Sequence, residues 1–405
     1  MRGSTPPRRF LVAAFGDPGH VFPAISLSRA LAERGHEVVV ETWEKWREPI
    51  EALGIGFTAA EEYRMFFPPE PDTSDGPSAG EAAVALRPLL EEMRPHAVVS
   101  DVLTLAPALA AERARVPLAT LIPHLFQVHE AGLPFFSAGL RYSRTRLGRG
   151  LWRAALPMLE AGLRHGRRDL NEQRAEVGLP PQERLHGGVS AELALVATFP
   201  QLEYPRRWPA HVHVTGPMPF ELPHPDIELP PGEGSLVLVA PSTSKDPGNR
   251  LVRTTLKALA DEPVRVVATT NLVVPQDPIE VPDNAILVDW LSYSQVMPRA
   301  SLVVCHGGHG TVARALAEGV PVLASPVAGD MAETGVRLDW AGVGLSVPWR
   351  FCRPGPLRWA ARRILDDPRF AARAADIAAW SRAHDGPARG AELVETLAQR
   401  SAIHM

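Results

Sequence analysis

Residues Val303 to Pro321 read VVCHGGHGTVARALAEGVP. A short apolar run ends in Cys305-His306, glycines follow, and a helical pattern of apolar residues begins near Thr311 and stops at Gly319. Glycines at such a turn let backbone N–H groups approach a ligand, and the N-terminus of the helix favours negative charge. The stretch therefore predicts a buried strand, a diphosphate-binding turn and a helix, as in parallel α/β sheets.

Two other interpretations of this stretch remain open. Its glycines are also typical of a tight turn that binds nothing. Cys305, His306 and His309 are residue types that bind zinc, but no Cys-x-x-Cys or His-x-x-x-His nearby completes four ligands, so we expect no metal. The chain has only two cysteines, the other being Cys352, which is consistent with a reducing compartment.

Outward from this stretch, β-branched runs alternate with amphipathic ones, a pattern typical of strands that feed helices in doubly wound sheets. The expected strands of the first half are 10–15, 37–42, 97–101, 118–122, 193–198 and 212–215. Those of the second half are 235–240, 265–269, 285–289, 302–305 and 321–325. We therefore predict two Rossmann-like α/β domains, 1–216 and 235–385, that face each other across a cleft. The proline- and glycine-rich segment 217–234 is the expected linker, and 386–405 the closing helix.

The composition excludes several classes of partner. The 405 residues carry a formal net charge of -4, so no basic surface favours nucleic acid. Charge or proline interrupts every apolar run well before the ~18 residues of a membrane span, and no signal-peptide core follows the polar N-terminus. We expect a soluble cytoplasmic protein without a membrane span, either a monomer or a homodimer.

Two further motifs flank the glycine turn, VDWLSYSQVMPRAS at 288–301 and SPVAGDM at 325–331. In this order, together with CHGGHGT and EGVP, they resemble the donor-binding signature of family 1 glycosyltransferases, which have the two-domain GT-B fold. The similarity covers most of the chain. It implies that the second domain binds a nucleotide-sugar donor, that the first binds an acceptor, and that the closing helix returns to the first domain.

The resemblance also implies a donor-binding set in the second domain, namely Trp290, Leu291, His306, Gly308, Gly310, Thr311, Val312, Glu318, Asp330, Met331, Ser242, Thr243 and Ser244. Trp290 would stack on a uracil or thymine base, and His306 would contact the diphosphate beside the helix N-terminus. Glu318 would hold the ribose and Asp330 the hydroxyls of the sugar. From the residues alone, Trp290 also fits a core position, Glu318 a solvated helix face and Asp330 a helix N-cap.

Two departures from the family pattern leave the sugar open. Met331 stands where the family commonly has glutamine, and Trp290-Leu291-Ser292-Tyr293 stands where it has Trp-x-Pro-Gln. A thioether cannot replace the two-way hydrogen bonding of an amide. A deoxygenated sugar is therefore as admissible as glucose.

Near the start of the chain, FGDPGHVFP at 15–23 places His20 where an apolar strand turns into a helix. Asp101 ends the expected strand 97–101, and parallel topology brings both residues to the same carboxyl edge. By resemblance, His20 is the catalytic base and Asp101 its partner. Such a carboxylate fixes the tautomer, leaves the other ring nitrogen free to accept a proton and stabilises the imidazolium. The alternative is that each residue caps a helix.

The acceptor is expected to meet the segment 122–142, which is apolar and aromatic but has no clean period; we name it the acceptor segment. The candidate acceptor-binding residues are Phe22, His124, Phe126, Phe135 and Phe136. An ordinary core role is the alternative for the phenylalanines. Such a lining suits a flat hydrophobic acceptor, such as a phenol or a polyketide.

The sequence thus predicts an inverting glycosyltransferase that moves a hexose from a UDP- or dTDP-sugar to a hydroxyl of a small hydrophobic acceptor, without metal or cofactor. The helix N-terminus near Thr311 would stabilise the leaving diphosphate, and the sequence lacks the Asp-x-Asp with which the other large glycosyltransferase fold holds its cation. The alternatives are a nucleotide-sugar epimerase of the same fold and a noncatalytic nucleotide-sugar-binding partner protein. An NAD-dependent dehydrogenase is disfavoured because the turn 16–19 lacks Gly-x-Gly-x-x-Gly.

Overall fold

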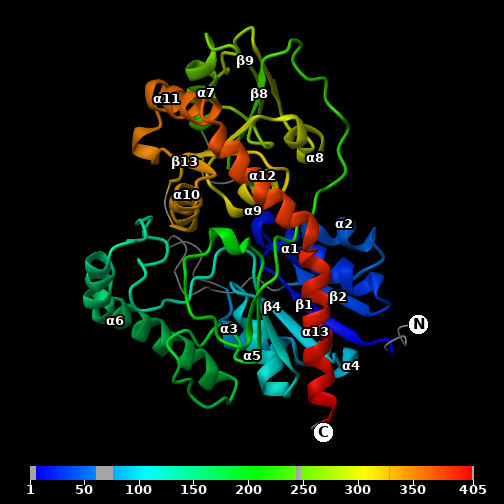
Figure 1. The fold of residues 1–405 in the computed structure, drawn as a ribbon. Coiled ribbons are helices and arrows are strands. Elements are labelled where there is room, and N and C mark those ends of the chain that lie inside the picture. The colour runs from blue at the N-terminus through cyan, green and yellow to red at the C-terminus, as the bar shows by residue number, and fades with distance from the viewer. Residues whose placement is uncertain (1–5, 61–75, 243–245, 247, 328, 404–405) are drawn as a thin grey trace.

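The computed structural model describes residues 6–60, 76–242, 246, 248–327 and 329–403. Its strands form two sheets, a seven-stranded one in the order β3-β2-β1-β4-β5-β6-β7 and a six-stranded one in the order β10-β9-β8-β11-β12-β13. The paired strands of both sheets run parallel. Figure 1 shows the two resulting domains, one above the other. The prediction of two doubly wound α/β domains is confirmed.

The first domain is built around β1 and β4, which lie side by side at the centre of its sheet. All five residues of β4 are buried, as expected of a parallel strand covered by helices on both faces. Its strands are β1 Arg9–Ala13, β2 Glu37–Thr42, β3 Gly56–Ala59, β4 Ala97–Asp101, β5 Leu118–Ile122, β6 Leu193–Val196 and β7 Val212–Val214. Its helices are α1 Pro18–Glu33, α2 Arg47–Glu51, α3 Ala79–Ala85, α4 Arg87–Met93, α5 Leu105–Ala114 and α6 Arg146–Glu176, with short 3-10 helices at Glu44–Trp46 and Pro200–Leu202.

The second domain repeats this plan around β8 and β11. Its strands are β8 Ser235–Ala240, β9 Val264–Thr269, β10 Ala285–Val288, β11 Leu302–Cys305, β12 Val322–Ala324 and β13 Gly344–Ser346. Its helices are α7 Arg250–Leu259, α8 Tyr293–Val296, α9 His309–Ala317, α10 Gly329–Ala341, α11 Pro354–Leu365 and α12 Pro368–Ala383, with 3-10 helices at Met297–Arg299 and Trp349–Phe351. The edge strands β3 and β13 were not expected from the sequence, because each is short and begins with glycine.

The two domains share buried contacts. Leu125 and Leu202 of the first domain belong to the same apolar cluster as Val312 and Leu338 of the second.

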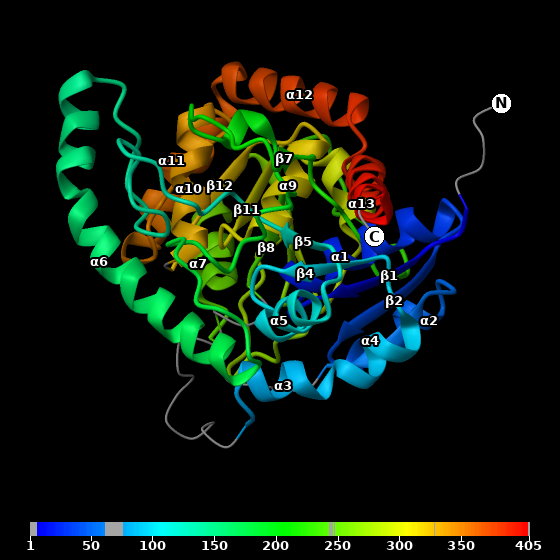
Figure 2. The same ribbon diagram turned by 90° about the horizontal axis from the view of Figure 1, so that it is seen from below.

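Seen from below, α6 in green runs along one flank of the molecule, and α13 in red lies away from it (Figure 2). No helix in the part of the chain that the structure describes combines the length and apolar character that a membrane span requires.

The last helix, α13 Gly386–Ile403, packs on α1 of the first domain. Figure 1 shows α12 lying on the second domain and α13 continuing along the first. Ala391, Val394 and Ala398 of α13 are buried in the core of the first domain. The chain therefore crosses to the second domain and returns.

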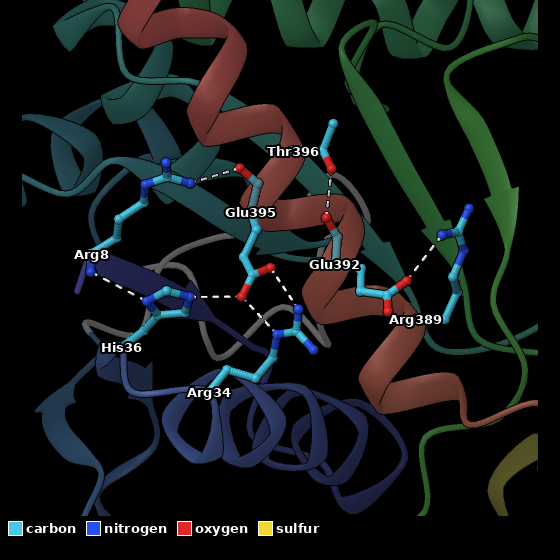
Figure 3. A network of polar contacts seen from close by, with 7 residues as sticks. All are labelled: Arg8, Arg34, His36, Arg389, Glu392, Glu395 and Thr396. Atoms are coloured by element: carbon cyan, nitrogen blue, oxygen red, sulfur yellow. Dashed lines mark hydrogen bonds and ion pairs between the residues drawn. The ribbon is translucent and has the colours of Figure 1, made fainter. Parts of the chain in front are cut away.

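Glu395 fixes this return by polar contacts (Figure 3). Its Oε1 and Oε2 accept hydrogen bonds from Nε and Nη2 of Arg34, at 2.6 and 2.8 Å. Nε2 of His36 donates to Oε1 at 2.8 Å, while Nδ1 of His36 accepts from the backbone N–H of Arg8. A neutral imidazole therefore satisfies both contacts. Arg8 also donates to the backbone carbonyl of Glu395 at 3.0 Å.

We expect Glu395→Gln to lower the free energy of unfolding by about 1–3 kcal/mol at neutral pH, because it weakens charged hydrogen bonds that are largely shielded from water. The hydrogen bond from Arg34 is the main cause that holds the pKa of Glu395 below its usual 4.5. A depressed pKa adds stability above the unfolded value and loses it as the pH falls through the folded one. The difference between wild type and variant should therefore shrink below pH 4.5.

Urea unfolding at several pH values measures this difference. Glu392→Gln is the matched control, because Glu392 lies one turn earlier on α13 and its pair with Arg389 is half exposed on both sides. Such a pair contributes little. Equal stability losses for the two variants, or a loss that does not depend on pH, would contradict the assignment to Glu395.

Candidate active site

His20 and Asp101 meet at the carboxyl edge of the first sheet. His20 lies in the first turn of α1, directly after β1, and Asp101 is the last residue of the neighbouring strand β4. Nδ1 of His20 lies 2.9 Å from Oδ2 and 3.1 Å from Oδ1 of Asp101. The carboxylate is fully buried, and the backbone N–H of Leu103 donates to its Oδ1 at 2.9 Å. The structure therefore brings this predicted pair into direct contact.

The environment of His20 suits a proton acceptor. Burial pulls the pKa of His20 down, but the Asp101 carboxylate outweighs burial through its charge and its hydrogen bond, so the pKa is raised from 6.5. Because Nδ1 donates to Asp101, the lone pair of the neutral ring lies on Nε2. The side chain keeps 17% of its surface exposed, so this nitrogen belongs to a group that a substrate can reach.

Two of the five acceptor candidates gather beside His20. The ring of His124 lies 6.1 Å from that of His20 and stacks on Phe136 at 5.9 Å. Burial, followed by the nearby His20, lowers the pKa of His124. Nδ1 of His124 donates to the carbonyl of Leu125 at 2.8 Å, which fixes the orientation of the ring.

The other three acceptor candidates pack elsewhere. Phe22 contacts Trp46 and Phe220, at ring distances of 5.3 and 5.4 Å. Phe135 contacts Trp152 of α6 at 5.6 Å. Phe126 is buried in an apolar cluster of the first domain, which is the core role that the sequence left open.

On the second domain, the glycine turn follows β11. Gly307 has φ +88°, which favours glycine, and Gly308 is the N-cap residue of α9. A Cβ at Gly308 would lie 2.2 Å from Nε2 of His306, so the imidazole occupies the space that a side chain would need. Gly310 is exposed in the first turn, with nothing within 4 Å of a Cβ placed there. The helix begins at His309, two residues before the predicted Thr311.

Two of the three candidate zinc ligands at this turn, Cys305 and His309, are buried. Burial raises the pKa of the Cys305 thiol to about 12. Burial, followed by His124, lowers the pKa of His309 to about 3. Within the described ranges, no three His, Cys, Asp or Glu side chains gather closely enough to hold a metal ion.

Asp330 connects the two halves of the site. It lies in the first turn of α10 and is exposed, so it is not the N-cap that the sequence left open. Its charge helps to raise the pKa of His20 in the first domain. It also opposes the lowering of the pKa of His124 and of His306 of the glycine turn. The carboxylate therefore lies within electrostatic reach of all three histidines. Next to it, the carbonyl of Met331 lies 3.0 Å from the Cβ position of Gly307.

The rest of the predicted donor set is less closely gathered. Trp290 is half-buried two residues after β10, whereas Leu291 and Val312 are buried in the core of the second domain. Thr311 is half-buried in the first turn of α9. Glu318 is exposed at the C-terminal end of α9, away from the glycine turn, so the structure does not bring it to the diphosphate-binding end. Ser242 is buried after β8, and Thr243 and Ser244 lie outside the described residues.

Comparison with known proteins agrees with this architecture. Residues 253–398 match the family described as erythromycin biosynthesis protein CIII-like, C-terminal domain, and residues 10–121 match the glycosyltransferase family 28 N-terminal domain. The 4'-demethylrebeccamycin synthase of Lentzea aerocolonigenes is 29% identical over 96% of this chain and 99% of its own length. The O-mycaminosyltylonolide 6-deoxyallosyltransferase of Streptomyces fradiae is 28% identical over 98% of this chain and 99% of its own.

Solved structures show the same fold. The glycotransferase of kitacinnamycin superposes with a TM-score of 0.77 at 21% identity, covering 96% of this chain and 99% of that one. The calicheamicin glycosyltransferase CalG4 superposes with a TM-score of 0.71 at 22% identity, covering 98% and 99%. Its two parallel-sheet domains and its glycine turn give the chain the GT-B glycosyltransferase fold, and the relatives that it resembles along nearly its whole length are glycosyltransferases of natural-product biosynthesis.

Proposed function

We propose that this protein is an inverting glycosyltransferase that moves a hexose from a UDP- or dTDP-sugar to a hydroxyl of a small hydrophobic acceptor. The observation that carries the proposal is the position of Asp330, within electrostatic reach of His20 and His124 on one domain and of His306 on the other. A sugar held at Asp330 would lie between a base and a diphosphate-binding turn. This is the arrangement that a single displacement at the anomeric carbon requires.

In this mechanism, Nε2 of His20 accepts the proton of the acceptor hydroxyl while the oxygen attacks the anomeric carbon. The bond from that carbon to the diphosphate oxygen breaks, and its electron pair leaves with the diphosphate. Asp101 stabilises the imidazolium that forms. The N-terminus of α9 and His306 stabilise the charge that develops on the leaving group, so the proposed reaction needs no metal. Attack from the opposite face converts an α-linked donor into a β-linked product.

Two observations limit the classes of acceptor and sugar that we propose. His124 and Phe136 form a stacked aromatic surface beside His20, which suits a flat hydrophobic acceptor such as a phenol or a polyketide. The Streptomyces fradiae relative is named for transfer of a 6-deoxyallosyl group. Met331 offers no amide to a sugar hydroxyl, so the donor panel includes deoxygenated hexoses beside glucose.

The test is a panel of UDP- and dTDP-sugars, first in a thermal-shift assay and then with phenolic and polyketide acceptors analysed by mass spectrometry. We expect a rise in melting temperature with one nucleotide class, an acceptor heavier by one hexose, and a β-linkage by NMR. Chelation of metals should leave the rate unchanged. Conversion of the donor in the absence of any acceptor would instead indicate an epimerase, and retention of configuration would overturn the single displacement.

The glycine turn offers a prediction of its own. We expect Gly308→Ala to weaken binding of UDP or dTDP by about tenfold or more, because a Cβ there displaces the imidazole of His306, whose contact with the diphosphate is a charge-assisted hydrogen bond. Alanine tolerates the φ of -60° at this position, so the fold should survive. Isothermal titration measures the affinity.

Gly355→Ala is the matched control for this prediction. Gly355 likewise lies at the start of a helix of the second domain, α11, and a Cβ there meets nothing within 4 Å. Unchanged nucleotide affinity in Gly308→Ala would show that the position of His306 is immaterial to the diphosphate.

A further inference from the structure

A buried arginine of the second domain is held by groups of the first. Arg337 of α10 is 3% exposed. Its Nε donates to Oε1 of Glu333, one turn earlier on α10, at 2.8 Å. Its Nη1 donates across the interface to the carbonyl of Leu202 at 3.0 Å and to Oε2 of Glu203 at 3.3 Å. The guanidinium carbon lies 3.4 Å from the ring centre of Tyr204. One side chain of the donor domain thus makes three separate contacts with the acceptor domain.

The same network reaches the acceptor segment at Phe126. Oε1 of Glu203 accepts from the backbone N–H of Phe126 at 2.7 Å. Phe136 of the same segment lines one pocket together with Glu333 and Arg337. Its ring stacks on His124 beside the proposed base. Arg337 therefore connects the segment beside His20 to α10.

The N-terminal end of α10 carries two residues that the proposed function assigns to the sugar donor. Asp330 and Met331 lie in its first turn, about two helical turns before Arg337. The helix is a rigid connection, so the position of its first turn follows from where Arg337 is held. A displacement of α10 relative to the acceptor segment would change the distance between a donor held at Asp330 and an acceptor held at Phe136.

The buried charges of Arg337, Glu333 and Glu203 explain why their contacts require a well-defined geometry. Burial raises the pKa of Glu333, whereas Arg337 lowers it. The side chains of both Glu203 and Arg337 are almost completely buried. Removal of Arg337 would leave the buried carboxylates of Glu203 and Glu333 without a positively charged partner, which is strongly destabilising. The planar guanidinium also satisfies partners in two directions at once, which fixes orientation as well as distance.

We propose that Arg337 is a positioning residue for sugar transfer: it sets the first turn of α10 against the acceptor segment, so that the acceptor hydroxyl lies within reach of both His20 and the anomeric carbon. This inference rests on the proposed function. It assigns Arg337 no contact with either substrate. A second ion pair between the same elements, Arg141 with Asp339 at 3.3 Å, provides a comparison, because Arg141 is 78% exposed and such pairs contribute little.

The test compares Arg337→Met, Arg337→Lys and Glu203→Gln with the matched control Arg141→Met. Glu203→Gln is the variant most certain to fold, because it leaves Arg337 balanced by Glu333 and keeps an oxygen for the backbone N–H of Phe126. The measurements are kcat and KM for the acceptor, the affinity for UDP or dTDP, and hydrogen exchange over 122–142 without substrates.

We expect Arg337→Met to lower kcat by about 10- to 100-fold, because small misplacements of reacting groups have effects of that size. Nucleotide affinity should stay within about threefold, because the diphosphate turn is untouched, and exchange over 122–142 should accelerate. Arg337→Lys should recover part of the rate, since lysine keeps the positive charge but lacks the planar group that donates in two directions. Glu203→Gln should lower kcat in the same way, and Arg141→Met should match wild type.

Two results would overturn the inference. The first is wild-type kcat in both Arg337→Met and Glu203→Gln. The second is a rate loss that parallels loss of folded protein, with unchanged kcat per folded molecule. If the wild-type protein transfers no sugar at all, the proposed function has failed instead; unchanged exchange over 122–142 in Arg337→Met would then overturn the connection by itself.

Discussion

His20→Ala should lower kcat by about 10²–10⁴-fold, the range typical for loss of a positioned general base. The acceptor hydroxyl would then have to lose its proton to water while it attacks. The affinity for UDP or dTDP should stay within about twofold, because the diphosphate turn belongs to the other domain. Because the His20 side chain is partly exposed, its removal leaves no large internal cavity, and the fold should persist.

Initial rates at saturating donor measure this effect, with the affinity for the nucleotide measured in parallel by calorimetry. His165→Ala is the control, because His165 lies exposed on α6 and takes part in no proposed step. Full turnover by His20→Ala would remove the assignment of the base. A loss of nucleotide affinity as large as the loss of rate would show that His20 acts in binding instead.

Asp101→Asn should lower kcat by about 10²–10³-fold through the tautomer of His20. Leu103 donates its backbone N–H to Oδ1, so the asparagine oxygen should keep that position and its NH₂ group should face His20. Nδ1 of His20 would then accept, and the ring proton would move to Nε2. A ring with its proton on Nε2 has no lone pair there to receive the proton of the acceptor.

The pH profile separates this tautomer effect from simple unfolding. The neutral form of His20 is the active one, and its pKa is raised from 6.5, so kcat/KM should fall as the pH drops through that raised value. Asp101→Asn removes the main raising cause and leaves burial, which lowers the pKa. The acid limb should therefore move to lower pH while the plateau drops. An acid limb at the same pH in wild type and Asp101→Asn would contradict the claim that Asp101 raises the pKa of His20.

The pairing of His20 with Asp101 is predictable from sequence because it follows from topology. Apolar runs such as 97–101 indicate buried parallel strands, and the carboxyl ends of neighbouring parallel strands lie at one edge. A polar residue at the end of such a strand, or at the start of the helix that follows it, is therefore brought to that edge by the sheet. The glycine turn after β11 is predictable because it too follows a buried parallel strand. The structure adds a steric reason for one of its glycines, since the imidazole of His306 occupies the space that a side chain at Gly308 would need.

The remaining parts of the site depend on packing that no local pattern records. Glu203 and Arg337 are separated by 134 residues, and either would be taken for an ordinary surface charge from its neighbours in the chain. The acceptor segment has no period that says which ring faces His20, so Phe136 and Phe126 look alike until their contacts are known. The resemblance assigns Glu318 to the ribose, and the structure places it at the C-terminal end of α9.

The crossing of α13 has a consequence for how the protein is made. The face of α1 that Ala391, Val394 and Ala398 cover leaves the ribosome long before those residues are synthesised. At ordinary rates of translation, the interval is roughly twenty to seventy seconds. During that time the nascent chain has an incomplete apolar surface that chaperones can bind. The half of the enzyme that is translated first is thus the half whose interior closes last.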